Sequence, residues 1–304
     1  MQRIEIIALK KDGKKIINRL QRRGSVEICD ISDDALAKRS AASAISELEK
    51  KRTDAQNAIE ILQRYSEKKP SLLDSFEGKR ELGEREFKEK SKSFGQIEEK
   101  IKIVLDTERE ISELKSGISG LALLCESLET WKKLDIPTAG VETKFTVSFV
   151  GSVPLKFEDG LFSDISEKAD VHVINRQKTS TDICVICLKS DADEVFSVLR
   201  DMGFSEISDK ADKTPAQLSE KYRAEAEQKQ STVETKEKSL TELSKGLKDA
   251  ELYYDGLSME EDRLCALQKS AESKETVIIS GYIPEKSGRR ISEELEKSFS
   301  AAVR

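Results

Sequence analysis

The sequence has few of the residues that build a large buried core. Aromatic residues make up 5% of its 304 positions, with one Trp and one His, and hydrophobic residues make up 37%. An ordinary soluble domain is about 45–50% apolar and about 25% charged, whereas 36% of this chain is charged. This shortage argues against a large enzyme core around a buried pocket, and it favours long solvated helices attached to small packed lobes.

Long uncharged runs and basic clusters are also missing. The longest uncharged stretch is the eleven residues Phe145–Leu155, whereas a helix that crosses a membrane needs about 20 apolar residues. The charged N-terminal residues do not form a secretion signal. With a net charge of −6 and no basic face, nucleic acid is not an expected partner.

The cysteine content excludes a disulfide framework. The chain has an odd number of widely spaced cysteines, which indicates a reducing, cytoplasmic compartment: Cys29, Cys125, Cys184, Cys187 and Cys265. Cys184 and Cys187 match C-x-x-C, but they lie in an apolar strand where residues three apart point to opposite faces. We therefore predict two buried structural cysteines rather than a zinc or redox site.

Other candidates for chemistry also fail. His172 has no second histidine with which to share a metal, so we assign it a structural or surface role. No G-x-x-x-x-G-K-(Ser/Thr) loop is present, which removes nucleotide hydrolysis of that kind. We predict no catalytic residue, no cofactor and no metal.

Three long segments have helical periodicity. Their narrow apolar seams, flanked by Glu and Lys, are typical of coiled coils. The first covers about 41–62 and ends before Pro70, the second covers about 81–134 and ends before Pro137, and the third covers about 215–273. Pro215 suits a first helical turn, with Asp212 or Thr214 as the N-cap. The matched lengths of the second and third segments predict an antiparallel hairpin.

The residues between those two helices, 138–210, read as strands and short helices. We predict the order β-α-β-β-α-β of a ferredoxin-like lobe. The expected strands are 145–150, 171–175, 183–188 and 204–207, and the expected helices are 160–168 and 191–202.

Two internal repeats flank the long helices. Residues 4–29 align without gaps with residues 183–208 and are identical at nine of 26 positions. In each copy an Asp caps a helix, and a glycine, Gly24 or Gly203, ends it where a positive φ is needed. The second repeat is the strand exit G-x-(Val/Ile)-Pro, found at Gly151–Pro154 and at Gly281–Pro284.

The repeats predict an α+β fold with two similar ferredoxin-like lobes. A terminal lobe would combine residues 1–31 with 274–304, and an insert lobe would be residues 138–210. The helical segments 32–137 and 211–273 would join them as a long antiparallel coiled-coil hairpin, giving a dumbbell. By the repeat, a strand begins near Ala301, so we expect the natural chain to continue.

These features resemble the V-type ATPase/ATP synthase subunit I, the counterpart of eukaryotic subunit a. The resemblance covers the whole chain but only the N-terminal cytoplasmic half of the family. Gly151, Pro154, Gly281 and Pro284 match the family's strand exits, although Tyr282 stands where the family usually has Trp.

The resemblance implies a non-catalytic stator part at the cytoplasmic face of a membrane. Such a part holds the peripheral stalk subunits E and G, so that rotation couples ATP to hydrogen ion transport. Through a membrane-embedded C-terminal half, it further implies contact with the C subunit of the central stalk and with the membrane rotor ring. The residues alone leave open a generic coiled-coil tether or chaperone-like scaffold unrelated to the ATPase.

Overall fold

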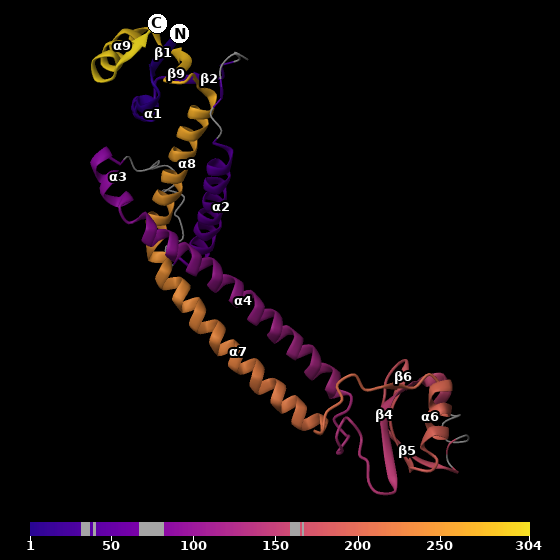
Figure 1. Ribbon diagram of the computed structural model, residues 1–304. Helices are drawn as coiled ribbons and strands as arrows, with labels where there is room; N and C mark the ends of the chain where they lie inside the picture. Colours follow the sequence, from indigo (N-terminus) through magenta and orange to yellow (C-terminus); the bar gives the residue numbers. More distant parts are fainter. Residues whose placement is uncertain (32–36, 39–40, 67–81, 159–164, 166) are drawn as a thin grey trace. The chain divides into compact units, whose positions relative to one another are not determined.

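The chain forms two compact units, each with one β-sheet and a set of helices (Figure 1). The computed structural model describes residues 1–31, 37–38, 41–66, 82–158, 165 and 167–304. Met1–Glu108 and Lys238–Arg304 form what we call the end unit, and Arg109–Glu237 form the middle unit. The mixture of helices with two antiparallel sheets confirms the predicted α+β class.

The terminal lobe lies in the end unit and is built from both ends of the chain. Its antiparallel sheet has the order β10-β1-β9-β8-β3, and β2 pairs with the same side of β9 as β8 does. The strands are β1 (Gln2–Leu9), β2 (Glu27–Cys29), β3 (Ala37–Lys38), β8 (Ala271–Glu272), β9 (Thr276–Ile283) and β10 (Ala301–Val303).

One face of this sheet carries the core of the lobe. Alternate residues of β1 and β9 point to that face, where they pack against α1 (Gly13–Arg23) and α9 (Glu285–Ser298). The side chains at the centre of this core are at most 2% exposed: Ile4, Ile6, Ile16, Leu20, Ile279 and Leu295.

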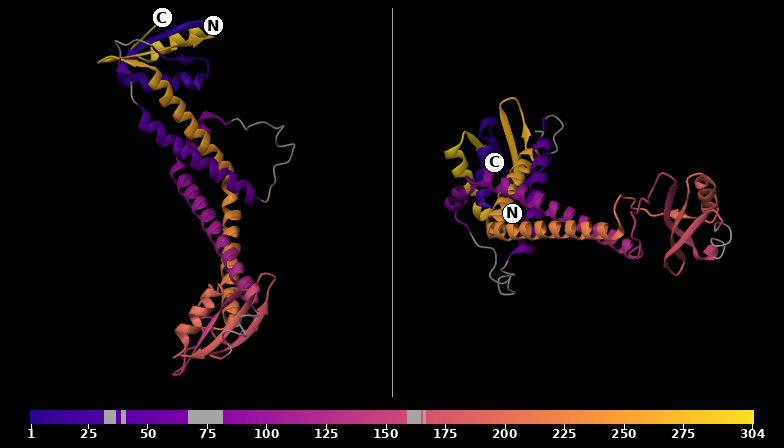
Figure 2. Two further views of the ribbon diagram at one scale, coloured as in Figure 1. Left: turned by 90° about the vertical axis from the view of Figure 1, so that its right-hand side faces the viewer. Right: turned by 90° about the horizontal axis from the view of Figure 1, so that it is seen from below.

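The insert lobe lies in the middle unit. Its sheet has the order β5-β6-β4-β7, all antiparallel, and α6 (Ala192–Asp201) covers one face (Figure 2). The strands are β4 (Thr146–Pro154), β5 (Ala169–Arg176), β6 (Ser180–Leu188) and β7 (Ser205–Glu206). All four predicted strands and the helix at 191–202 are therefore present. Most of the predicted helix 160–168 lies outside the described residues.

The two sheets share one plan. The order β10-β1-β9-β2 in the terminal lobe corresponds to β5-β6-β4-β7 in the insert lobe. The similarity extends to the hairpin before β4 and β9. There the Thr143 N–H donates to Thr146 O at 2.9 Å, and the Ser273 N–H donates to Thr276 O at 2.8 Å. The repeat seen in the sequence is thus a repeat of strand order and hydrogen bonding.

The long helices are more broken than the apolar seams predict. The second predicted helix is two helices, α3 (Glu84–Ser91) and α4 (Phe94–Glu129). The third is α7 (Pro215–Leu243) and α8 (Leu247–Lys269), with a 3₁₀ turn at Ser244–Gly246 between them.

Serine hydroxyls and an aromatic cluster mark the first of these breaks. Ser91 and Ser93 donate to the carbonyls of Lys88 and Lys90, which are carbonyls of the helix end. The Phe94 ring then lies edge-on between Phe87 and Tyr253, with centroid distances of 6.0 and 5.3 Å.

The first predicted helix is α2 (Ala42–Tyr65), which ends before the expected boundary at Pro70, a residue outside the described ones. It packs along α8, and an ion pair of 3.0 Å joins Arg52 to Glu261.

The middle unit contains a pair of antiparallel helices, formed by residues 109–129 of α4 and 215–237 of α7. Lys115 pairs with Glu237 at 2.7 Å, Glu110 pairs with Lys236, and Arg223 pairs with Glu129 at 3.0 Å. The helix α7 begins with a capping box, in which Thr214 Oγ1 accepts from the Gln217 N–H and Gln217 Oε1 accepts from the Thr214 N–H. Thr214, rather than Asp212, is therefore the N-cap.

Candidate functional site

The two glycines of the repeated strand exit lie where a neighbouring strand comes close. A Cβ atom on Gly151 would lie 2.3 Å from the carbonyl oxygen of Ser205, and one on Gly281 would lie 2.3 Å from that of Glu27. Ser205 lies in β7, which pairs with β4, and Glu27 lies in β2, which pairs with β9. Each of them directly precedes the residue that is paired with the glycine. Only glycine fits this approach of one backbone to another.

The prolines of the strand exit lie where a strand gives way to a helix. Pro154 is the last residue of β4 and precedes the short 3₁₀ helix Leu155–Phe157, while Pro284 precedes α9. Their φ angles of −58° and −60° are those that the proline ring imposes. These residues set the direction of the chain and carry no reactive group.

The glycines that follow α1 and α6 have left-handed backbones. Gly24 has a φ of 58° and Gly203 a φ of 74°, a region in which side chains with a Cβ are strained. One expectation is wrong: neither Asp12 nor Asp191 makes a side-chain cap hydrogen bond. Both residues already have helical backbone angles, whereas a side-chain cap forms from an extended N-cap residue.

An ion pair that the sequence analysis missed occurs once in each lobe, at equivalent positions. Lys10 Nζ lies 2.7 Å from Glu272 in the terminal lobe, and Lys189 Nζ lies 2.6 Å from Glu142 in the insert lobe. Hydrogen bonding to Lys189 and its charge lower the pKa of Glu142. The lysines are identical in the aligned repeat, and each glutamate lies four residues before its β-strand, which was the available signal.

The C-x-x-C cysteines point to opposite faces of the insert sheet. Each is 3% exposed: Cys187 packs with Val195 and Leu199 on the α6 side, and Cys184 packs with Leu128 and Trp131 on the other. Burial, with a smaller effect of Asp135, raises the pKa of Cys184 to about 11, and burial also raises that of Cys187. The prediction of two buried cysteines is confirmed, and the pair cannot close on one metal ion.

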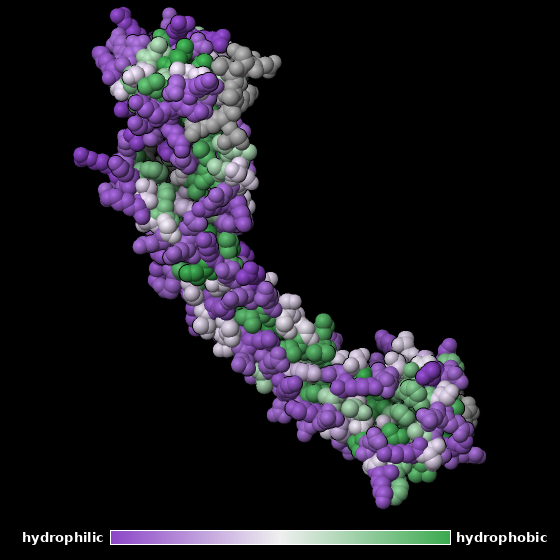
Figure 3. All heavy atoms as spheres, in the orientation of Figure 1, coloured by the Kyte–Doolittle hydropathy of each residue, from purple (hydrophilic) through white to green (hydrophobic). Residues whose placement is uncertain are grey.

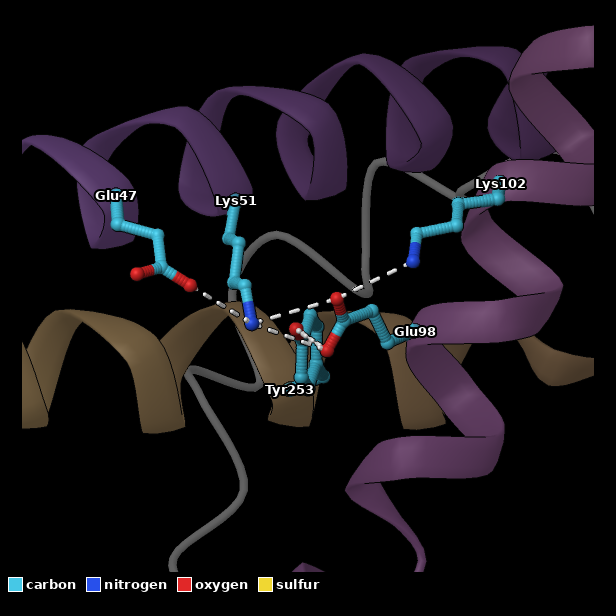
Figure 4. A network of polar contacts seen from close by, with 5 residues as sticks. All are labelled: Glu47, Lys51, Glu98, Lys102 and Tyr253. Carbon is cyan, nitrogen blue, oxygen red and sulfur yellow. Dashed lines mark hydrogen bonds and ion pairs between the residues drawn. The ribbon is translucent and has the colours of Figure 1, made fainter.

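The end unit contains a polar network that joins three helices (Figure 4). The carboxylate of Glu98 on α4 accepts from Lys51 on α2 at 3.4 Å and from the Tyr253 hydroxyl on α8 at 3.2 Å. Lys102 lies 3.5 Å from the same carboxylate, and Glu47 lies 3.6 Å from Lys51. The network fixes the register of the three helices relative to one another.

The electrostatics of this network favour an ionised Glu98. Burial raises the pKa of Glu98, but Lys51, the Tyr253 hydroxyl and Lys102 outweigh it, so the net pKa is lowered. The phenol of Tyr253 has a raised pKa, because burial and the charge of Glu98 both disfavour its phenolate. Neither group is poised to exchange a proton near neutral pH, which suits a structural contact.

The described residues contain no further arrangement typical of a reactive site. No group of three or more His, Cys, Asp or Glu side chains in this part of the chain could hold a metal ion. His172 is exposed on β5, an edge strand of the insert sheet. Within the same residues, no helix is long and apolar enough to cross a membrane.

Comparison with known proteins adds to this picture. No protein-family model matches the chain. The A-type ATP synthase subunit I of Methanocaldococcus jannaschii is 22% identical over an alignment of 333 residues, gaps included, and this alignment covers 98% of this chain. The resemblance to subunit I is confirmed.

A solved structure shares the fold over the whole chain. It is the crystal structure of the cytoplasmic N-terminal domain of subunit I, described as a homolog of subunit a of V-ATPase. The two chains cover each other completely with a TM-score of 0.52 and 14% sequence identity. This chain spans 46% of the length of the archaeal subunit I, so it matches about half of that protein.

Proposed function

We propose that this chain is a cytoplasmic stator part of a rotary V/A-type ATPase, and that it anchors the peripheral stalk subunits E and G to the membrane sector. The observation that carries the proposal is the match to subunit I over 98% of the chain. In this role the chain is non-catalytic and resists the torque of the rotor, so that rotation couples ATP to ion transport. Contacts with the C subunit of the central stalk and with the rotor ring would come from the remaining half of a full subunit I.

The architecture of each unit suits such a mechanical role. Helices of the end unit are joined by the Glu98 network, and those of the middle unit by ion pairs such as Lys115–Glu237. Each unit also carries a lobe with its own packed core. Two attachments on one chain raise the effective concentration of each, so that weak individual contacts would suffice.

We further propose that the two lobes lie at opposite ends of a helical hairpin, as a dumbbell. In this arrangement the lobe formed by residues 1–31 and 274–304 binds one partner, and the lobe formed by residues 138–210 binds another. The length of α4, 36 residues or about 54 Å, supports it. A compact globule of this size would have a radius of gyration of about 19 Å, so we expect small-angle scattering of the monomer to give a clearly larger value.

The stator proposal is tested by a pull-down with purified E and G subunits from the same source. The full chain is compared with a chain in which residues 140–210 are replaced by a short glycine linker. The junction is suited to this, because the Ala139 N–H donates to Ala211 O at 3.1 Å and the two ends therefore already lie side by side. We expect the full chain to bind at low salt and the shortened chain to bind less.

Two outcomes separate the proposal from a generic tether or chaperone-like scaffold. If the full chain binds neither E nor G, the stator proposal fails and the tether explanation gains. If both forms bind equally, the chain holds the stalk without the insert lobe. As a control for folding, circular dichroism of the shortened chain should show that the helices of the end unit are still formed.

A further inference from the structure

The insert lobe has an open strand edge beside β4. Residues 141–143 form the outer arm of the hairpin that leads into β4, and Glu142 pairs with Val147 in an isolated antiparallel bridge. The neighbouring residues bond inward: the Ser148 N–H donates to Val141 O at 3.0 Å, and the Thr143 N–H donates to Thr146 O at 2.9 Å. Because bonding alternates along a strand, the N–H and C=O of Glu142 point away from β4.

In the terminal lobe the equivalent edge is covered. Glu272 occupies the position of Glu142, and it pairs with Val277 as Glu142 pairs with Val147. On its outer side, however, β8 pairs antiparallel with β3, with Ala37 opposite Glu272 and Lys38 opposite Ala271. The chain thus supplies its own strand at this edge, whereas among the described residues no strand pairs with the outer side of residues 141–143.

The connections explain why one edge is covered and the other is not. In the terminal lobe the chain that follows β2 comes close to Lys269, where the Ile31 N–H donates to Lys269 O at 3.4 Å. Further along, residues 37–38 pair with β8 as β3. In the insert lobe the chain passes the equivalent point, where the Ala139 N–H donates to Ala211 O, and then enters α7 at Pro215. In the described part of the chain, no segment returns along the edge formed by residues 141–143.

Burial differs between the lobes in the way an absent strand predicts. The side chain of Glu142 is 68% exposed, whereas that of Glu272 is 8% exposed. Val141 is 38% exposed, whereas Ala271, at the same position, is 1% exposed.

Exposed apolar residues lie on the same face of the sheet as Val141. Val141 lies beside Ser148, which is paired with Ile186 on the same face, and Leu188 lies one row further on. Ile186 and Leu188 are 37% and 51% exposed. In the space-filling view, apolar residues reach the surface on the insert lobe, while hydrophilic ones dominate the surface of the long helices (Figure 3).

We propose that residues 141–143 are a docking edge, to which an extended segment of a partner protein adds as an antiparallel strand. The occupant is an extended peptide because the chain itself places β3 on the equivalent edge. Backbone bonds to the N–H and C=O of Glu142 provide the register, and an apolar side chain opposite Val141 continues the exposed row. The inference rests on the internal repeat, and it holds whether or not the partner is a stalk subunit.

The test uses the full chain and a synthetic peptide of residues 33–41 of this sequence carrying Lys38→Val, which places an apolar side chain opposite Val141. Binding is followed by NMR of the backbone amides. We expect shifts confined in the insert lobe to residues around 141–143, and slower hydrogen exchange of the Glu142 amide.

Two matched peptides decide whether binding is by strand addition. Ala37 is opposite Glu272 in β3, so its N–H points to the edge, and that of residue 38 points away. An N-methyl group on the Ala37 amide should weaken binding roughly tenfold or more, because a bond is lost and the approach is blocked. The same group on residue 38 should leave binding nearly unchanged.

Three outcomes would overturn the proposal. One is the absence of any protection at residue 142 at millimolar peptide, and another is equal binding of the two methylated peptides. The third is protection of Glu142 without peptide together with a dimer in analytical ultracentrifugation, which would make a second copy of this chain the occupant.

Discussion

At the scale of single residues, the protein depends on positions where a side chain would collide with backbone. Gly151 and Gly281 are such positions, since the carbonyl oxygen of an adjacent segment occupies the place of a Cβ. Gly120 is different, because it lies exposed in α4 and a Cβ atom there would have no neighbour within 4 Å. The same substitution should therefore have opposite effects at the two kinds of site.

We expect Gly151→Ala to lower the free energy of unfolding of the middle unit by about 1–3 kcal/mol, the usual cost of forcing an atom into packed structure. The matched change Gly120→Ala should raise it by up to about 1 kcal/mol, since alanine favours the helix. Urea unfolding followed by the fluorescence of Trp131, the sole tryptophan, measures both. Equal effects of the two substitutions would contradict the strand-contact explanation.

The buried cysteines make a second prediction at this scale. With a pKa of about 11, Cys184 is almost entirely a thiol at pH 8, and a thiol is a poor nucleophile. We expect iodoacetamide at that pH to leave Cys184 and Cys187 unmodified in the native protein while it modifies the half-buried Cys29. Peptide mass spectrometry reads each site, and all three should react in urea. Rapid native labelling of Cys187 would show that the insert sheet opens readily.

At the scale of secondary-structure elements, the Glu98 network ties α2, α4 and α8 together. It contributes stability only while the carboxylate is ionised. The folded protein lowers the pKa of Glu98, so the stabilisation is complete above the unfolded pKa of about 4.3 and is lost as the pH falls through the folded value.

We expect Glu98→Gln to reduce the stability of the end unit by roughly 1 kcal/mol at pH 7, the scale of a partly exposed charge-assisted bond. The difference from the unchanged protein should shrink as the pH falls from the unfolded pKa of about 4.3 through the lower folded pKa, because the carboxylate of the unfolded chain takes up its proton first. Urea unfolding followed by circular dichroism at pH 7 and pH 3.5 measures it. Glu47→Gln is the control, because Glu47 is 72% exposed and pairs with Lys51 within the same helix, α2. A pH-independent difference would exclude the ionised carboxylate as the cause.

Elements that depend on the local sequence could be predicted, and features that depend on contacts between distant parts of the sequence could not. The strands and α6 were predictable from short apolar runs, from the apolar face of residues 191–202, and from the repeat, which aligns residues 4–9 with residues 183–188. The break at Ser244–Gly246 was not predicted, because the apolar seam of Leu243 and Leu247 continues across it. The break after Ser91 was not predicted either, and there the Phe94 ring packs against Tyr253, which is far away in the sequence.

The candidate contacts divide in the same way. Gly24, Gly151, Gly203 and Gly281 were found because a backbone requirement leaves a local signature. The Glu98 network was missed, because Lys51 and Tyr253 lie 47 and 155 residues from Glu98 in the sequence.

At the scale of the whole molecule, the chain consists of two units that each hold their own core. Trp131 lies in the middle unit, in a cluster with Leu128, Leu134 and Leu218. Its fluorescence should therefore report on that unit and not on the other.

We expect Gly281→Ala, in the end unit, to move part of the circular dichroism transition to lower urea while leaving the Trp131 transition in place. Gly151→Ala should do the reverse. The reason is that the two glycines belong to different units with separate cores, and sites without shared partners act independently. If each substitution shifts both signals equally, the units unfold as one cooperative body.

The pairing of β1 with β9 and β10 has a consequence for the order of events during synthesis. Residues 2–9 are made long before their strand partners, residues 276–283 and 301–303. The middle unit, by contrast, is one continuous stretch of chain, residues 109–237, and domains generally fold as units while the chain grows. The insert sheet can therefore form while the apolar strand Ile4–Ala8 still lacks its strand partners, and that strand must stay soluble until residues 276–283 have been made.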